Sequence, residues 1–225
     1  MSESESFIEE VSEEVRRDKL YAVYRKYGWI AGLLVVLVVG GAAYNEWRKA
    51  SQAAAAQSLG DSVMSALEAT DPEQRANALG NITKNNEGAG IFLSMLEAAA
   101  RTEADDKDRA LVLLDAVAAD GKAPEIYRQL ATFKAVVLRG SDQDRDQRLA
   151  TLDDLATAGN PFRVLAMEQK ALALFEFGDN DAAIGLLRTI QDEPGATQGL
   201  LQRTQQLIVA MGGNPSGIEE MTDGN

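Results

Sequence analysis

An uncharged apolar run near the N-terminus constrains this chain more than any other feature. It covers residues 27–44, 18 residues without a charged side chain. A helix of that length spans about 27 Å, close to the roughly 30 Å hydrocarbon core of a bilayer. Aromatic residues stand at both ends of the run: Tyr27, Trp29, Tyr44 and Trp47. Because amphipathic rings at both ends are typical of membrane spans, we expect a transmembrane helix at residues 27–47.

Two other interpretations of the run remain open. A cleaved signal peptide needs a short basic segment before a shorter apolar run, with small residues directly after it. Here about 26 mostly polar residues precede the run, and Glu46, Arg48 and Lys49 follow it. The second alternative, a core helix of a soluble protein, would not require aromatic residues at both ends.

The Lys and Arg residues that flank the run predict its orientation. Two basic residues, Arg48 and Lys49, follow it, and five precede it: Arg16, Arg17, Lys19, Arg25 and Lys26. Under the positive-inside rule the more basic side stays in the cytoplasm. We therefore expect a cytoplasmic segment at residues 1–26 and an exported domain at residues 48–211. Residues 1–26 could form a separate amphipathic helix or a helix that extends the span.

Gly28 and Gly32 form a GxxxG pattern at the start of the run. Small residues at this spacing allow two transmembrane helices to approach closely. The pattern predicts possible self-association through this face, although glycine is common in membrane spans in any case.

The composition excludes most catalytic chemistry. The chain has no Cys and no His, so it has no thiolate nucleophile, no Cys- or His-ligated zinc and no Ser-His-Asp triad. It also shows no phosphate-binding glycine loop or nucleophile elbow. Its formal net charge of -13 disfavours binding to nucleic acid. We expect a protein that is not an enzyme and that uses no cofactor or metal.

The region after residue 51 reads as a helical repeat. It is rich in helix-forming residues, and acidic or glycine-containing turns divide it into segments of roughly 14 to 18 residues. Four segments resemble one another: DPEQRANALGNI, DKDRALVLLDAV, DRDQRLATLDDL and DNDAAIGLLRTI. Their apolar positions recur at steps of 35, 38 and 35 residues. This period predicts an all-α fold, a tetratricopeptide-like solenoid of about four helix pairs.

Some details of the repeat are less regular. Arg148 occupies the position at which the best-matching segment has the small residue Ala183, so a non-repetitive helical bundle remains an alternative. We expect residues 197–211 to form a terminal capping helix and residues 212–225 to form a flexible acidic tail.

A solenoid presents an extended concave face that can bind another protein. We expect the first helices of each pair to line this face, and the candidates for such a groove are Phe92, Met95, Tyr127, Phe133, Phe162, Met167, Phe175 and Phe177. The alternative for each is packing between helices, because aromatic side chains contribute much of a core.

The sequence DQDRDQRLATLD has acidic residues at several positions of a calcium-binding loop. Asp142, Asp144 and Asp146 stand at positions one, three and five, and Asp153 stands at position twelve. Position six is Gln147, where such loops need glycine, and position twelve should be Glu. The alternative is that these aspartates cap a helix, and we expect no calcium site here.

Residues 7–60 resemble a known family. The sequence EEVSEEVRRDKLYAVYRKYGW, the apolar run and YNEWRKASQAAAAQ resemble the N-terminal signature of YfgM-like proteins, in particular their alphaproteobacterial branch. The resemblance implies a single-pass inner-membrane protein with a periplasmic tetratricopeptide-like domain. In that family the protein is an ancillary subunit of the SecYEG translocon and works with a membrane-anchored periplasmic chaperone on exported proteins.

We therefore expect a membrane-anchored scaffold that binds proteins on the exported side. Two alternatives remain. The protein could be an accessory or assembly subunit of another inner-membrane complex, or a homo-oligomeric structural protein of the envelope that pairs through Gly28 and Gly32.

Overall fold

The computed structural model describes residues 3–84 and 86–214, and the regular secondary structure of these residues is helical. The chain divides into two compact units, residues 1–61 and residues 62–225. The helices are α1 (Glu3–Leu67), α2 (Pro72–Gly80), α3 (Glu87–Glu103), α4 (Lys107–Ala119), α5 (Glu125–Arg139), the short 3-10 helix η1 (Gly140–Asp142), α6 (Arg145–Leu155), α7 (Arg163–Glu176), α8 (Asn180–Gln191) and α9 (Gln198–Ala210). The predicted all-α class is confirmed.

The first unit consists of most of helix α1. Between Arg25 and Leu67 this helix is long and apolar enough, by length and composition, to cross a membrane. The large apolar side chains of residues 33–39 are 49 to 66% exposed, so they are not buried in a core formed by the described residues. Residues 3–26 belong to the same helix, as the alternative of an extended span predicts.

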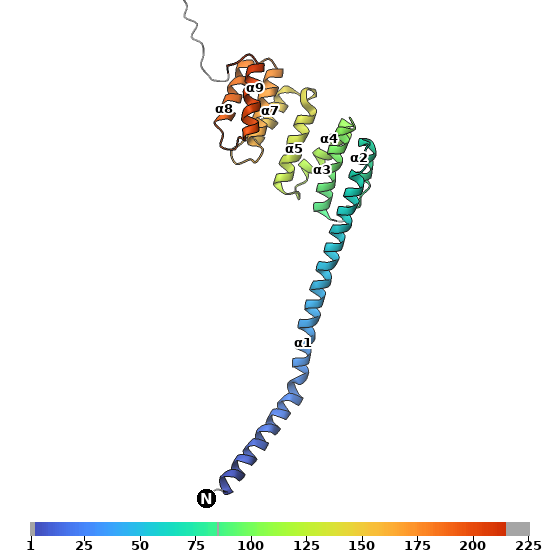
Figure 1. Ribbon diagram of the computed structural model, residues 1–225, viewed down its shortest axis with the longest axis vertical. Helices are drawn as coiled ribbons and strands as arrows, with labels where there is room; N and C mark the ends of the chain where they lie inside the picture. Colours follow the sequence, from blue (N-terminus) through green and yellow to red (C-terminus); the bar gives the residue numbers. More distant parts are fainter. Residues whose placement is uncertain (1–2, 85, 215–225) are drawn as a thin grey trace, which may run out of the picture. The chain divides into compact units, whose positions relative to one another are not determined.

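The second unit repeats a pair of helices. The four similar segments of the sequence form α2, α4, α6 and α8, and each follows another helix, respectively the end of α1, α3, α5 and α7. From α2 to α9, neighbouring helices pack against one another in chain order (Figure 1). The leucines at equivalent positions are all buried: Leu79, Leu114, Leu152 and Leu187. These features confirm the predicted solenoid, and α9 follows the last pair at the predicted place.

The core of the second unit is divided among successive helices. One apolar cluster joins α3, α4 and α5, a second joins α5, α6 and α7, and a third joins α7, α8 and α9. Since each cluster involves only neighbouring helices, the unit has the nearest-neighbour organisation of a repeat protein.

Acidic residues begin the second helix of each pair. Asp71, Asp106 and Asp144 accept a hydrogen bond from a backbone N–H in the first turn of α2, α4 and α6, which stabilises the helix start. Asp179 precedes α8 without such a bond and forms an ion pair with Arg145 instead.

The predicted segment lengths are too long for several helices. Helix α2 has 9 residues and α6 has 11, because the residues on both sides of each helix form turns. The chain leaves α2 after Gly80, and residues 81–84 are non-helical.

The irregular Arg148 has a structural explanation. It is 4% exposed, and its guanidinium forms an ion pair with Glu176, 28 residues further along. Two repeats earlier, Arg75 occupies the equivalent position and pairs with Glu103, also 28 residues away. The repeat that follows each of these has a buried alanine at this position, Ala110 after Arg75 and Ala183 after Arg148. Polar and small residues therefore alternate at one packing position along the array.

Candidate protein-binding surface

A groove of about 350 Å³ lies between α3 and α5. It is called here the α3–α5 groove, and nine residues line it: Ala98, Ala99, Thr102, Glu103, Leu114, Phe133, Lys134, Val137 and Leu138. Helices α3 and α5 are the first helices of two successive pairs, and Leu114 of α4 lies between them in the chain. Val137 is 41% exposed, which leaves an apolar side chain uncovered at the groove.

The polar residues of the groove differ in whether they have partners. The Thr102 hydroxyl donates to the backbone carbonyl of Ala98 at 2.8 Å, and Glu103 forms the ion pair with Arg75. Lys134 is exposed, and among the described residues no ion pair or hydrogen bond of its ammonium group is found. The groove therefore combines an apolar surface with one unpaired positive charge.

Side chains connect the next two pairs of helices along the array, α5 with α7 and α7 with α9. Phe133 of α5 stacks on Phe162, which directly precedes α7, with ring centroids 6.0 Å apart and planes 12° apart. Between α7 and α9, Arg203 donates to the buried carboxylate of Glu168 at 2.8 Å. Compared with these two contacts, the space between α3 and α5 is open.

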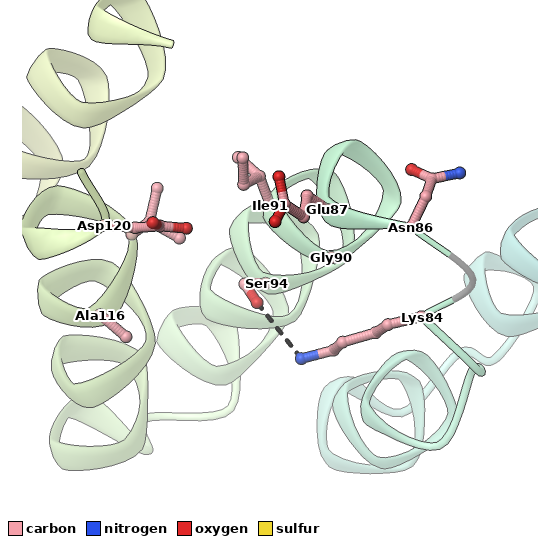
Figure 2. Close-up of a pocket in the computed structure, with 9 residues that line it drawn as sticks. Lys84, Asn86, Glu87, Gly90, Ile91, Ser94, Ala116 and Asp120 are labelled. Carbon is pink, nitrogen blue, oxygen red and sulfur yellow. Dashed lines mark hydrogen bonds between the residues drawn. The ribbon is translucent and has the colours of Figure 1, made fainter. Parts of the chain in front are cut away.

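A second cavity, of about 490 Å³, lies between the start of α3 and the end of α4. It is called the α3–α4 cavity. Figure 2 shows Lys84 reaching Ser94 of α3, with Ala116 of α4 and Asp120, which directly follows α4, on the opposite side. The Lys84 ammonium donates to the Ser94 hydroxyl at 3.4 Å, and Glu87 forms an ion pair with Lys122 at 3.0 Å. The charged groups of this cavity are thus already engaged within the protein.

The structure brings together only some of the aromatic residues predicted for the groove. Phe133 lines the α3–α5 groove, and Phe162 stacks on it. Phe92, Tyr127 and Phe175 are exposed and lie outside the groove lining.

The other three candidates contribute to packing. Met167 belongs to the core, Met95 packs against the cluster of α3, α4 and α5, and the Phe177 ring lies 5.2 Å from the Arg145 guanidinium. Sequence reasoning did not identify Lys134 and Val137, although they belong to the same helix as Phe133 and fall on adjacent turns of it.

The predicted span residues that the structure describes are exposed on α1. The side chains of Arg16, Arg17 and Lys19 lie outside the described ones, whereas Arg25 and Lys26 are exposed. The four aromatic residues are 51 to 68% exposed: Tyr27, Trp29, Tyr44 and Trp47. No atom within 4 Å would meet a Cβ added at Gly28 or Gly32 among the described residues, so this face is open for contact. Residues 215–225 of the predicted tail lie outside the described residues.

The aspartates of the calcium-like sequence make other contacts. Asp144 accepts from the backbone N–H groups of Asp146 and Gln147 at 3.0 and 3.2 Å, as the helix-capping alternative predicts. Asp142 pairs with Lys107, and this hydrogen bond lowers the pKa of the Asp142 carboxyl. Among the described residues, no group of acidic side chains is arranged to hold a metal ion.

Glu193 provides a test of how one of these ion pairs affects stability. Hydrogen bonds from Arg163 at 2.6 and 3.1 Å lower the pKa of the Glu193 carboxyl below its ordinary value of 4.5. The pair therefore stabilises the fold fully above pH 4.5, and the effect is lost as the pH falls through the lowered pKa.

We expect the Glu193→Gln variant to unfold at a lower temperature than wild type at pH 7, with the difference vanishing in acid. Thermal unfolding of the full chain in detergent, followed by circular dichroism, measures this. Asp192→Asn removes the neighbouring exposed carboxylate and should show no such pH-dependent difference. A Glu193→Gln difference that persists unchanged in acid would contradict the assignment.

The repeated helix pairs define a protein of the helical-repeat solenoid class. A family model described as a tetratricopeptide repeat-like domain matches residues 22–189. This is well over half of the chain, so the chain belongs to this family. Neither a curated protein nor a solved structure matches the chain. Tetratricopeptide repeat-like domains are typically non-catalytic scaffolds that mediate protein–protein interactions.

Proposed function

We propose that this protein is a membrane-anchored scaffold whose repeat domain binds other proteins in the periplasm. The observation that carries the proposal is the presence, in one chain, of a tetratricopeptide-like domain with an open apolar groove and of a helix long and apolar enough to span a membrane. The excess of basic residues before the apolar run supports a cytoplasmic N-terminus and a periplasmic domain at residues 48–211.

The partner we propose is the SecYEG translocon, together with a membrane-anchored periplasmic chaperone. The support is the resemblance of residues 7–60 to YfgM-like proteins. Anchoring confines the repeat domain to the membrane surface, which raises its effective concentration beside other membrane complexes. Weak contacts in a groove can then suffice for recruitment.

Copurification tests the partner. The full chain, extracted from its native membranes in mild detergent and captured by an affinity tag, is expected to recover a translocon component and a periplasmic chaperone, as identified by mass spectrometry. Recovery of a different inner-membrane complex, with neither of these, would replace the translocon assignment with the accessory-subunit alternative.

The absence of cysteine makes the topology easy to test. Single cysteines introduced as Ser4→Cys, in the N-terminal segment, and as Ser141→Cys, at an exposed position before α6, can be labelled with a membrane-impermeant maleimide. In spheroplasts only the cysteine at position 141 should react, and after membrane disruption both should react. Labelling only at position 4 in spheroplasts would reverse the proposed orientation.

A further inference from the structure

We infer that the α3–α5 groove binds an apolar partner segment that carries a carboxylate, and that the carboxylate pairs with Lys134. This inference rests on the proposed protein-binding function and specifies the chemistry of the segment bound.

The shape and lining of the groove favour apolar side chains. Most of its lining is aliphatic or aromatic, and its volume of about 350 Å³ falls within the range of sites that bind small ligands. Val137, which lines the groove, remains 41% exposed. A partner side chain placed against Val137 and Ala99 would remove apolar surface from water, which is the main favourable contribution to association.

The charges at the groove favour a partner with a negatively charged side chain. Glu103 is already neutralised by Arg75, whereas Lys134 has no partner among the described residues. The domain as a whole is acidic, with 15 basic and 27 acidic residues from residue 51 onward. An exposed ammonium at the edge of an apolar groove is therefore a local exception, and it complements a carboxylate on the partner.

The charged side chains that line the α3–α4 cavity already have partners within the protein. In the α3–α4 cavity Lys84 is bonded to Ser94, Glu87 is paired with Lys122, and Asp120 accepts from the Lys122 backbone N–H at 3.0 Å. A ligand there would have to compete with these contacts. In the α3–α5 groove the Lys134 ammonium gains a partner without losing one.

Fluorescence anisotropy with synthetic peptides tests the inference. The full chain in lipid nanodiscs is titrated against labelled probes that share a Leu-Phe-Leu core and differ only in the flanking pair, Glu-Glu, Gln-Gln or Lys-Lys. We expect the Glu-Glu probe to bind roughly fivefold or more tightly than the Lys-Lys probe, because an attraction replaces a repulsion. Lys134→Glu should reverse this order, and Lys134→Gln should abolish it.

Matched variants separate the groove from general effects of charge and folding. Val137→Asp places a charge in the groove and should remove binding of all three probes. Val112→Asp makes the same change at a position on α4 that is 68% exposed and outside the groove, and it should leave binding unchanged. Arg109→Glu makes a comparable charge reversal on α4 and should preserve the preference for Glu-Glu. Circular dichroism of each variant checks that the helices remain folded.

Three results would overturn the inference: equal affinity for the three probes, an order that Lys134→Glu leaves unchanged, or binding that survives Val137→Asp. If the probes do not bind and Val137→Asp dissociates a dimer seen by light scattering, the groove contacts a second copy of the chain instead. The peptide titration and the copurification can fail separately. The wild-type chain could recover translocon components and still bind the three probes with equal affinity. In that case the scaffold function stands and the docking chemistry is wrong.

Discussion

Val36→Arg combined with Val39→Arg is expected to remove this protein from the membrane. Both positions lie in the middle of the apolar run and are more than 60% exposed on α1. An arginine at the centre of a membrane span is unfavourable by about 2.5 to 3.5 kcal/mol in insertion measurements, so the pair opposes insertion by about 5 to 7 kcal/mol. Alkaline carbonate extraction of membranes measures the effect, and the variant should shift from the pellet to the soluble or degraded fraction.

Ser51→Arg combined with Ala54→Arg is the matched control. It adds the same charges at the same spacing to exposed positions of α1 outside the uncharged run, and it should remain in the pellet. If the variant at positions 36 and 39 also resists extraction, α1 does not anchor the protein through residues 27–47.

The fold was predictable because its determinants are local in the sequence. The run at residues 27–44 depends only on length and the absence of charge, and α1 meets the criteria for a span. The leucines that recur at steps of 35, 38 and 35 residues specify which side of each second helix is buried. Helix ends were less predictable, because a capping aspartate and a closing turn take residues that are also compatible with a helix.

The site was less predictable because it depends on pairings between helices. The pattern of α5 identifies Phe133 as a large side chain at a helix interface, but it does not show that Phe133 would both stack on Phe162 and line a groove. Likewise, Lys134 becomes distinctive only because Glu103 pairs with Arg75, 28 residues earlier in the chain. Such pairings follow from three-dimensional packing and have no local sequence signal.

Arg148 illustrates the same limit within the core. From the sequence it is a departure from the repeat, since a charged residue replaces a small one. The structure shows that its charge is balanced by Glu176 of the next helix, in the same way as Arg75 and Glu103 two repeats earlier. Arg75 and Arg148 therefore occupy equivalent positions two repeats apart and form equivalent ion pairs with the next helix.

Leu187→Ala is expected to destabilise one end of the repeat domain by about 2 to 5 kcal/mol, the range for a buried leucine that leaves a cavity. Leu187 is 0% exposed and belongs to the cluster that joins α7, α8 and α9. Because the stability of a repeat protein depends on contacts between neighbours, the loss should be greatest in these three helices. The α3–α5 groove lies in the preceding repeats and should keep its structure.

Hydrogen exchange of the full chain, read by mass spectrometry, distinguishes this local effect from a global one. Peptides from α7, α8 and α9 should lose protection in Leu187→Ala by a larger factor than peptides from α3 and α4. Val209→Ala truncates a side chain of α9 that is 58% exposed and should change protection little. Equal loss of protection across all helices of the second unit would show that the domain unfolds as a single cooperative body. The groove and the C-terminal helices would then share one stability, and a core substitution at either end would weaken partner binding as much as one in the groove itself.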